Sequence, residues 1–194
     1  MNKIFEKGGK FYWLHSTVDA FETFLHVPGT VTRKGSHVRD AIDLKRLLIL
    51  VVIAAAPAAL FGMWNVGYQH GLAVGDLRLN ILGNFWYGFL RVLPLYLVSY
   101  IVGLGIEFAS CQIRGEEVSE GYLVSGFFIP LIVPVDIPLW MLAVAVAFAV
   151  IFGKEVFGGT GMNIVNPAIL ARASLDFFQV VLVHGNLWEK HSTY

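Results

Sequence analysis

A glycine-rich turn near the end of the sequence carries the residues best suited to hold a ligand. It contains Gly158, Gly159 and Thr160, and it is followed by Asn163 and Asn166. Glycines permit positive φ angles and a close approach to the backbone, and N–H groups at a following helix start can face an anion or a polar ring edge. The three-residue spacing of the asparagines predicts a shared helical face, on which each offers an acceptor and a donor. This combination suits the mixed edge of a flavin or quinone, and a polar turn that caps a helix is the alternative.

Two carboxylates border apolar stretches of the chain. Glu107 lies near the end of one stretch and Glu155 follows another. A carboxylate at membrane depth is costly unless it is paired, hydrated or used, and sodium is a hard cation that prefers oxygen ligands. Both residues are therefore candidates for a Na⁺ pathway, with the adjacent Lys154 neutralising Glu155. The alternative for Glu107 is an interfacial carboxylate that snorkels to water.

The remaining ionisable residues indicate neither a metal centre nor a nucleic-acid partner. No two of the six histidines are three or four residues apart, as ligands on adjacent helical turns would be, and Cys111 is the single cysteine, so haem, zinc and iron–sulfur ligation are not expected. The 14 basic and 14 acidic residues cancel, which leaves no basic field for phosphates. Arg91 is interpreted as an outer-face anchor and Asp136 as a solvated turn residue.

The composition is typical of a protein that lies in a lipid bilayer. Of 194 residues, 56% are apolar and 14% charged, against about a quarter charged in ordinary soluble domains. Apolar stretches occupy residues 47–67, 89–111, 122–133 and 138–153. The first two reach the ~20 residues that span a bilayer, whereas the third is short and closed by prolines. With the glycine turn and the apolar segment 162–178 as a broken fifth crossing, the sequence predicts an all-α integral membrane protein of about four transmembrane helices plus this fifth segment.

The chain divides into three parts. Residues 1–46 form a polar leader with most of the basic residues, which predicts a cytoplasmic amino terminus. Apolar residues recur at helical spacing between Phe11 and Leu25, as in a helix that lies on the membrane surface or packs on a partner subunit. Residues 47–178 form the transmembrane domain, and residues 179–194 a tail.

Two separated motifs resemble one protein family. Residues 156–168 read VFGGTGMNIVNPA, and residues 35–46 read GSHVRDAIDLKR. The first is similar to the signature of the B subunit (NqrB) of the sodium-translocating NADH:quinone oxidoreductase, which the D subunit of the Rnf complex shares more loosely. The second resembles the cytoplasmic lead-in to the first helix of NqrB. The similarity runs from about residue 8 to residue 172, includes residues 117–121, and favours NqrB because the long leader is present.

The resemblance implies a function for the residues singled out above. In that complex electrons pass from NADH to quinone, and the energy released moves sodium out across the bacterial inner membrane. NqrB works with the other subunits and supplies membrane flavins and part of the quinone site. The implied contacts of non-covalent riboflavin are Gly158, Gly159, Thr160, Asn163 and Asn166. The positions implied in quinone entry and sodium uptake are Gly103, Glu107, Glu120 and Gly121.

The sequence departs from the family in one respect. The family protein is roughly twice as long and consists of two inverted halves, the second of which carries a Ser-Gly-Ala-Thr motif whose threonine bears FMN. This chain resembles the first half, and none of its threonines matches that motif, so we expect riboflavin without covalent FMN and an obligatory association with partner chains. Two alternatives remain: an Rnf-type subunit of a ferredoxin-linked pump, and a non-redox channel or assembly scaffold.

Overall fold

The computed structural model of the chain describes residues 34–36, 44–75, 80–114, 121–159 and 162–191, with only the backbone given for 44–46 and 182–191. These residues form helices and no strand, which confirms the all-α prediction. The surface helix expected between Phe11 and Leu25 lies outside the described residues. The helices are α2 Leu44–Val74, α3 Ile81–Arg114, α4 Gly121–Ile132, α5 Leu139–Gly153, the short 3₁₀ helix η2 Glu155–Phe157, and α6 Pro167–His191.

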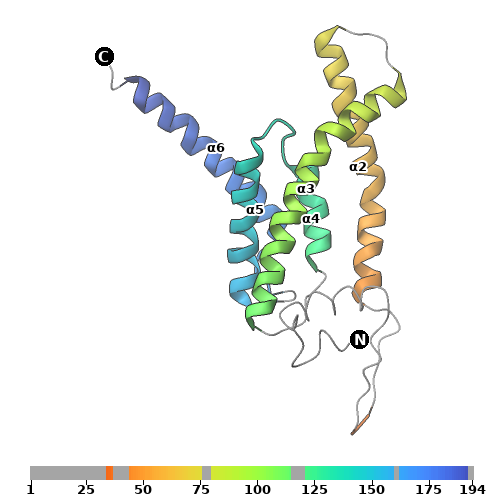
Figure 1. Cartoon of the computed structure of the whole chain (residues 1–194), viewed down its shortest axis with the longest axis vertical. Helices are drawn as coiled ribbons and strands as arrows, with labels where there is room; N and C mark the ends of the chain where they lie inside the picture. Colours follow the sequence, from red (N-terminus) through yellow and green to blue (C-terminus); the bar gives the residue numbers. More distant parts are fainter. Residues whose placement is uncertain (1–33, 37–43, 76–79, 115–120, 160–161, 192–194) are drawn as a thin grey trace, which may run out of the picture.

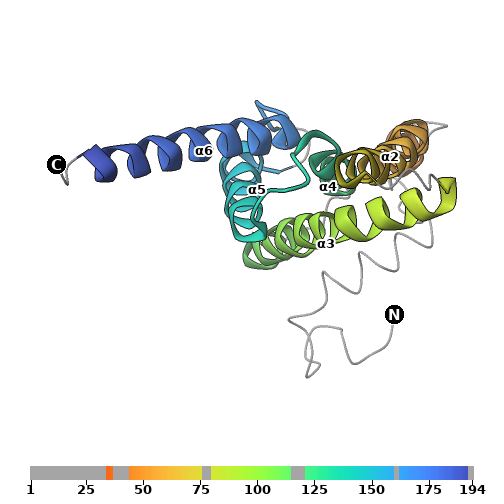
Figure 2. The ribbon, with the colours of Figure 1, turned by 90° about the horizontal axis from the view of Figure 1, so that it is seen from above.

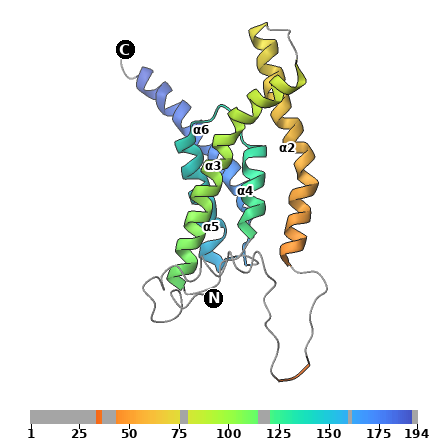
Figure 3. The ribbon, with the colours of Figure 1, turned by 45° about the vertical axis from the view of Figure 1, so that its right-hand side comes forward.

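Successive helices run in alternating directions. From the lower end in Figure 1, α2 ascends, α3 descends, α4 ascends, α5 descends and α6 ascends again, and Figure 3 shows the same order from another side. The lower ends of α3 and α5 therefore lie at the end where α2 begins. Because α2 contacts α3 and α4, α3 contacts α4 and α5, and α6 contacts α4 and α5, the helices form one bundle.

The two longest helices exceed the stretches expected from hydropathy. With 31 and 34 residues, α2 and α3 measure about 46 Å and 51 Å, more than the ~30 Å of a hydrocarbon core. Their connected ends project above the turn between α4 and α5 (Figure 1). The 12-residue α4 is short, as predicted. Among the described residues, three segments have the length and apolar composition of a membrane span: Leu47–Val74, Ile81–Arg114 and Leu139–Phe157.

Helix α5 supplies most of the buried core. Its sequence is apolar on every side, yet its buried residues recur at intervals of about four, because α3 and α6 cover opposite flanks (Figure 2). Small side chains at Ala145, Ala149 and Gly153 allow these neighbours to approach closely. The buried residues of α5 are Met141, Leu142, Ala145, Val146, Ala149, Val150 and Gly153.

Glycines bring α2 and α3 into backbone contact. A Cβ at Gly88 would overlap the carbonyl oxygen of Met63, and one at Gly67 would overlap that of Asn84. Neither carbonyl can rotate away, because each belongs to a helix backbone. The close approach of the two helices therefore depends on glycine at both positions, as in membrane helix pairs with small residues at the interface.

We expect Gly88→Ala to separate α2 from α3. The added methyl group meets backbone, so the helices must move apart, at a cost of about 1–3 kcal/mol. The measurement is the thermal unfolding midpoint of the chain purified from membranes. Gly62→Ala is the matched control, since a Cβ at Gly62 meets nothing within 4 Å. A midpoint for Gly88→Ala equal to that of Gly62→Ala would contradict the close approach.

Candidate functional site

A buried ion pair joins α3 to the end of α5. Glu107 has no exposed surface and Lys154 is 3% exposed. The Lys154 ammonium donates a hydrogen bond to Oε1 of Glu107. A carboxylate that snorkels to water would be exposed, so this interpretation of Glu107 is wrong. Glu107 is instead a paired charge inside the bundle.

A second ion pair lies beside the first. Ser110 donates to Oε2 of Glu155 at 2.6 Å, and Arg114 Nη1 lies 3.4 Å from the same oxygen. Arg114 Nη2 also donates to the backbone carbonyl of Glu155. We refer to Glu107, Ser110, Arg114, Lys154 and Glu155 as the charge cluster.

The expected neutralisation of Glu155 by Lys154 is wrong. Lys154 contacts Glu107, and Arg114 takes its place at Glu155. The reason is the local backbone: Lys154 separates α5 from η2 with φ −131° and ψ −59°, so the two consecutive side chains leave the backbone in different directions. Adjacent residues in a helical turn do not face one another.

Helix α3 positions Glu107 through a regular buried stripe. Ser99, Gly103, Glu107 and Cys111 are all buried and recur every four residues, so Gly103 lies one turn from Glu107 on the same face. A Cβ at Gly103 would overlap the ring of Tyr122, which is fully buried. The space over Gly103 is thus filled by an aromatic side chain.

Hydrogen bonds hold Tyr122 in that position. Its hydroxyl donates to the carbonyl of Ser99 at 3.0 Å, and Ser99 Oγ donates to the carbonyl of Gly126 at 3.2 Å. Of the other two positions implied in quinone entry, Gly121 is the first residue of α4, and Glu120 lies outside the described residues.

The glycine turn follows directly after the charge cluster. Gly158 and Gly159 adopt φ angles of 111° and 90°, a region that L side chains rarely occupy, as the sequence predicted. Their N–H groups donate to the carbonyls of Glu155 at 3.2 Å and Lys154 at 3.1 Å. Lys154 therefore belongs to both features: its side chain contacts Glu107 and its carbonyl closes the turn. Thr160 lies outside the described residues.

The asparagines do not share a helical face, which corrects the expectation from their spacing. Both precede α6, which begins at Pro167. Proline favours the first position of a helix and disfavours helical backbone in the residue before it, so the helix begins here and not at residue 162. Asn166 caps α6 by accepting the N–H of Ala168 on Oδ1 at 2.9 Å. The capping alternative is therefore correct for Asn166, whose amide N–H₂ takes no part in that bond.

The turn and the asparagines lie on an open face of the chain. Asn163 and Asn166 are exposed, and so are the apolar residues Val156, Met162 and Ile164 around them. A Cβ at Gly159 would meet nothing within 4 Å. Amide groups within an apolar rim, beside a backbone without side chains, fit one wall of a site for a planar ring system with a polar edge, such as a flavin.

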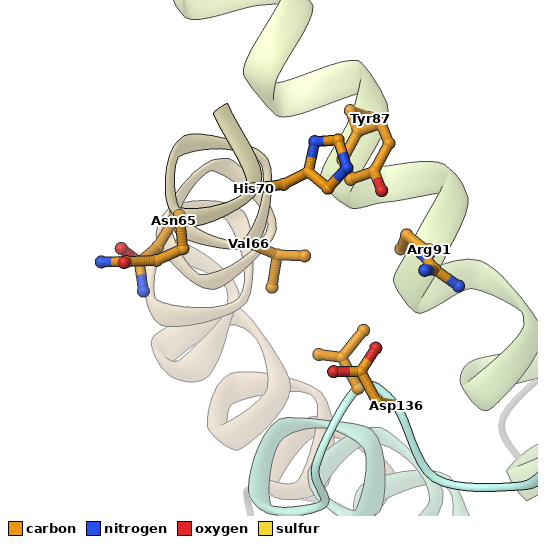
Figure 4. A pocket seen from close by; sticks show the side chains of 8 residues that line it. Asn65, Val66, His70, Tyr87, Arg91 and Asp136 are labelled. Atoms are coloured by element: carbon orange, nitrogen blue, oxygen red, sulfur yellow. The ribbon is translucent and has the colours of Figure 1, made fainter. Parts of the chain in front are cut away.

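A separate, open cavity lies at the other end of the bundle. It has a volume of about 420 Å³ and is lined by α2, α3 and the turn between α4 and α5 (Figure 4). His70 stacks on Tyr87 with ring centroids 4.2 Å apart, and Arg91 and Asp136 line the same cavity. Asp136 is exposed, as expected of a turn residue, and Arg91 is exposed at this end of α3.

Three members of the charge cluster, Ser110, Arg114 and Lys154, were not predicted in the roles that the structure gives them. Ser110 and Arg114 follow Glu107 by three and seven residues, a spacing that places all three on one side of a helix. This periodicity was a usable signal for a polar patch at the end of α3. No pattern in the sequence indicates that Lys154 contacts Glu107, since the two are 47 residues apart.

These features define a helical membrane protein with buried ion pairs and a glycine turn at one end of its bundle. The sequence model of the NQR2, RnfD, RnfE family matches residues 31–190, and the chain belongs to this family. The match extends past residue 172, where the resemblance of the motifs was expected to fade.

Curated relatives share one name, that of the B subunit of the Na(+)-translocating NADH-quinone reductase. The chain is 44% identical over 204 residues to this protein from Stutzerimonas stutzeri, covering 94% of this chain and 51% of that protein. Identity to the proteins of the same name is 42% in Ectopseudomonas mendocina and 41% in Pseudomonas aeruginosa, with the same coverage. The chain spans about half the length of the curated relatives it matches.

Proposed function

We propose that the chain is the first half of a membrane subunit of a sodium-translocating NADH:quinone reductase, active only with partner subunits in the bacterial inner membrane. The observation that carries the proposal is the 44% identity to the Stutzerimonas stutzeri protein over 94% of the chain. It favours this complex over an Rnf-type pump, whose electron donor differs while the local chemistry is shared.

The open face at the glycine turn is the proposed riboflavin wall. Gly158, Gly159 and Thr160 would lie against the ring system, and the amides of Asn163 and Asn166 would bond its polar edge. When bound, the flavin would supply the electron-accepting and electron-donating chemistry that no side chain offers. Since this wall is exposed, we propose that a partner segment covers it. Covalent FMN is not expected on the present residues.

The charge cluster is the proposed Na⁺ pathway, next to the proposed quinone site. Carboxylate oxygens of Glu107 and Glu155 and the hydroxyl of Ser110 are hard ligands of the kind that sodium prefers. Gly103, Glu120 and Gly121 are the further residues proposed for quinone entry. Gly103 acts there through packing, because the Tyr122 ring occupies the space over it.

The test is purification of the chain with its native partners, followed by measurement of bound flavin and of sodium-stimulated quinone reduction. We expect flavin that is released on denaturation, together with quinone reduction that rises with sodium. A flavin-fluorescent band of this size after denaturation would contradict the absence of covalent FMN. Solute flux without flavin would replace the proposal with the channel alternative, and reduction driven by ferredoxin instead of NADH would replace it with the Rnf alternative.

A further inference from the structure

The ion pair between Lys154 and Glu107 suggests how sodium occupancy is controlled, if Glu107 serves the proposed Na⁺ pathway. We propose that Lys154 is an internal competitor of sodium: its ammonium neutralises Glu107 when the ion is absent, and it must withdraw before Na⁺ can bind there. Lys154 is thus a positioning residue that sets the apparent sodium affinity and links it to the glycine turn.

Burial strongly disfavours an ionised Glu107 that lacks a counter-cation. An ionised carboxylate with no exposed surface is strongly disfavoured unless a positive charge lies beside it. The Lys154 ammonium is in contact with Oε1 and is itself almost fully buried. Sodium and ammonium carry the same charge and both use the carboxylate oxygen, so their simultaneous presence would place two cations together in a low dielectric. The two cations therefore alternate.

The second ion pair keeps Glu155 from becoming an alternative partner of Lys154. Its Oε2 is held by Ser110 at 2.6 Å and lies 3.4 Å from Arg114 Nη1. Arg114 also donates to the backbone carbonyl of Glu155, which fixes the guanidinium in place. A Lys154 side chain that leaves Glu107 therefore finds the adjacent carboxylate already neutralised, and we expect the backbone at residue 154 to move with it.

The backbone of Lys154 connects this movement to the glycine turn. Its N–H donates to Val150 at 3.2 Å, and its carbonyl accepts from Phe157 at 3.3 Å and Gly159 at 3.1 Å. Rotation at residue 154 changes the turn that these bonds close. A change at the proposed flavin wall would in this way alter the fraction of molecules in which Glu107 is available to sodium.

The test uses the purified complex that contains this chain, with radioactive sodium binding at equilibrium and the sodium dependence of quinone reduction as readouts. If Lys154 occupies Glu107 in about nine of ten molecules, Lys154→Gln lowers the half-saturating sodium concentration about tenfold. Lys154→Arg acts in the opposite direction and raises it, because a guanidinium binds a carboxylate through two parallel bonds and stays charged. Lys34→Gln, the same substitution at an exposed lysine, leaves it unchanged.

A half-saturating concentration unchanged in both Lys154 variants, or a decrease in Lys154→Arg, would overturn the inference. If Lys154→Gln fails to assemble, the increase expected for Lys154→Arg decides alone. Glu107→Gln separates this inference from the proposed function. If the half-saturating sodium concentration of Glu107→Gln is unaltered, Glu107 does not belong to the sodium pathway. If it is raised in Glu107→Gln but unchanged in the Lys154 variants, Glu107 belongs to the pathway and Lys154 does not compete with sodium.

Discussion

Gly103→Ala is expected to destabilise the chain, and with it to lower the proposed quinone reduction, by expelling Tyr122 from its buried position. The added Cβ overlaps the Tyr122 ring, and the displaced hydroxyl loses its bond to the Ser99 carbonyl. Overpacking together with a lost buried hydrogen bond destabilises the chain by about 3 kcal/mol. For a chain of this length, that corresponds to a decrease on the order of 10 °C in the unfolding midpoint. The measurements are the midpoint and the rate of quinone reduction in the purified complex.

The neighbouring Gly105 provides the matched control. A Cβ at Gly105 meets nothing within 4 Å, and alanine is the better helix former, so Gly105→Ala should leave the midpoint unchanged or raise it. Tyr122→Leu provides the partner variant for a double-mutant cycle. If the clash is the cause, Gly103→Ala costs less in the Tyr122→Leu background than in the native one. Strictly additive effects would show that Gly103 acts through something other than Tyr122.

Replacement of Asn163 and Asn166 by leucine is expected to remove most of the proposed non-covalent riboflavin while the helices remain folded. Two hydrogen bonds of about 1 kcal/mol each correspond to about thirtyfold weaker binding. The measurement is the flavin released from the purified complex by denaturation, relative to protein. Full flavin content in the double variant would exclude these amides as the main contacts.

Asn166 also caps α6, so its two roles must be separated. Asn166→Asp keeps an oxygen that can accept the Ala168 N–H and removes the amide donor. We expect this variant to retain the α6 start and to bind flavin about fivefold more weakly, which would assign the loss to the missing donor and not to an unravelled helix. Asn65→Leu, in the cavity at the other end of the bundle, controls for the substitution itself.

Most of the fold was predictable from hydropathy and local backbone chemistry. Long apolar stretches predicted the spans, prolines predicted the short α4, and glycine pairs predicted the positive φ angles of the turn. The ends of the helices were less predictable, because α2 and α3 continue through polar residues that lie outside the apolar stretches of membrane-spanning length. The start of α6 was misplaced where the three-residue spacing of the asparagines was given more weight than Pro167.

The two carboxylates of the charge cluster were predictable from the sequence, whereas their partners were not. Glu107 and Glu155 stood out because charges are rare within apolar sequence, yet which cation neutralises each depends on the packing of α3 against α5. Adjacency in sequence suggested Lys154 for Glu155, whereas the backbone at residue 154 directs its side chain to Glu107. The contact between Gly103 and Tyr122 was hidden for the same reason, since it joins two helices.

The ascending direction of α6 has a consequence for the relatives of twice this length. Because α6 runs in the same direction as α2, it leads the chain toward the end of the bundle opposite to the start of α2 (Figure 1). A second copy of this arrangement that followed in the same chain would begin from that opposite side and would be inserted upside down. The odd number of α-helices from α2 to α6 would in this way give two antiparallel halves.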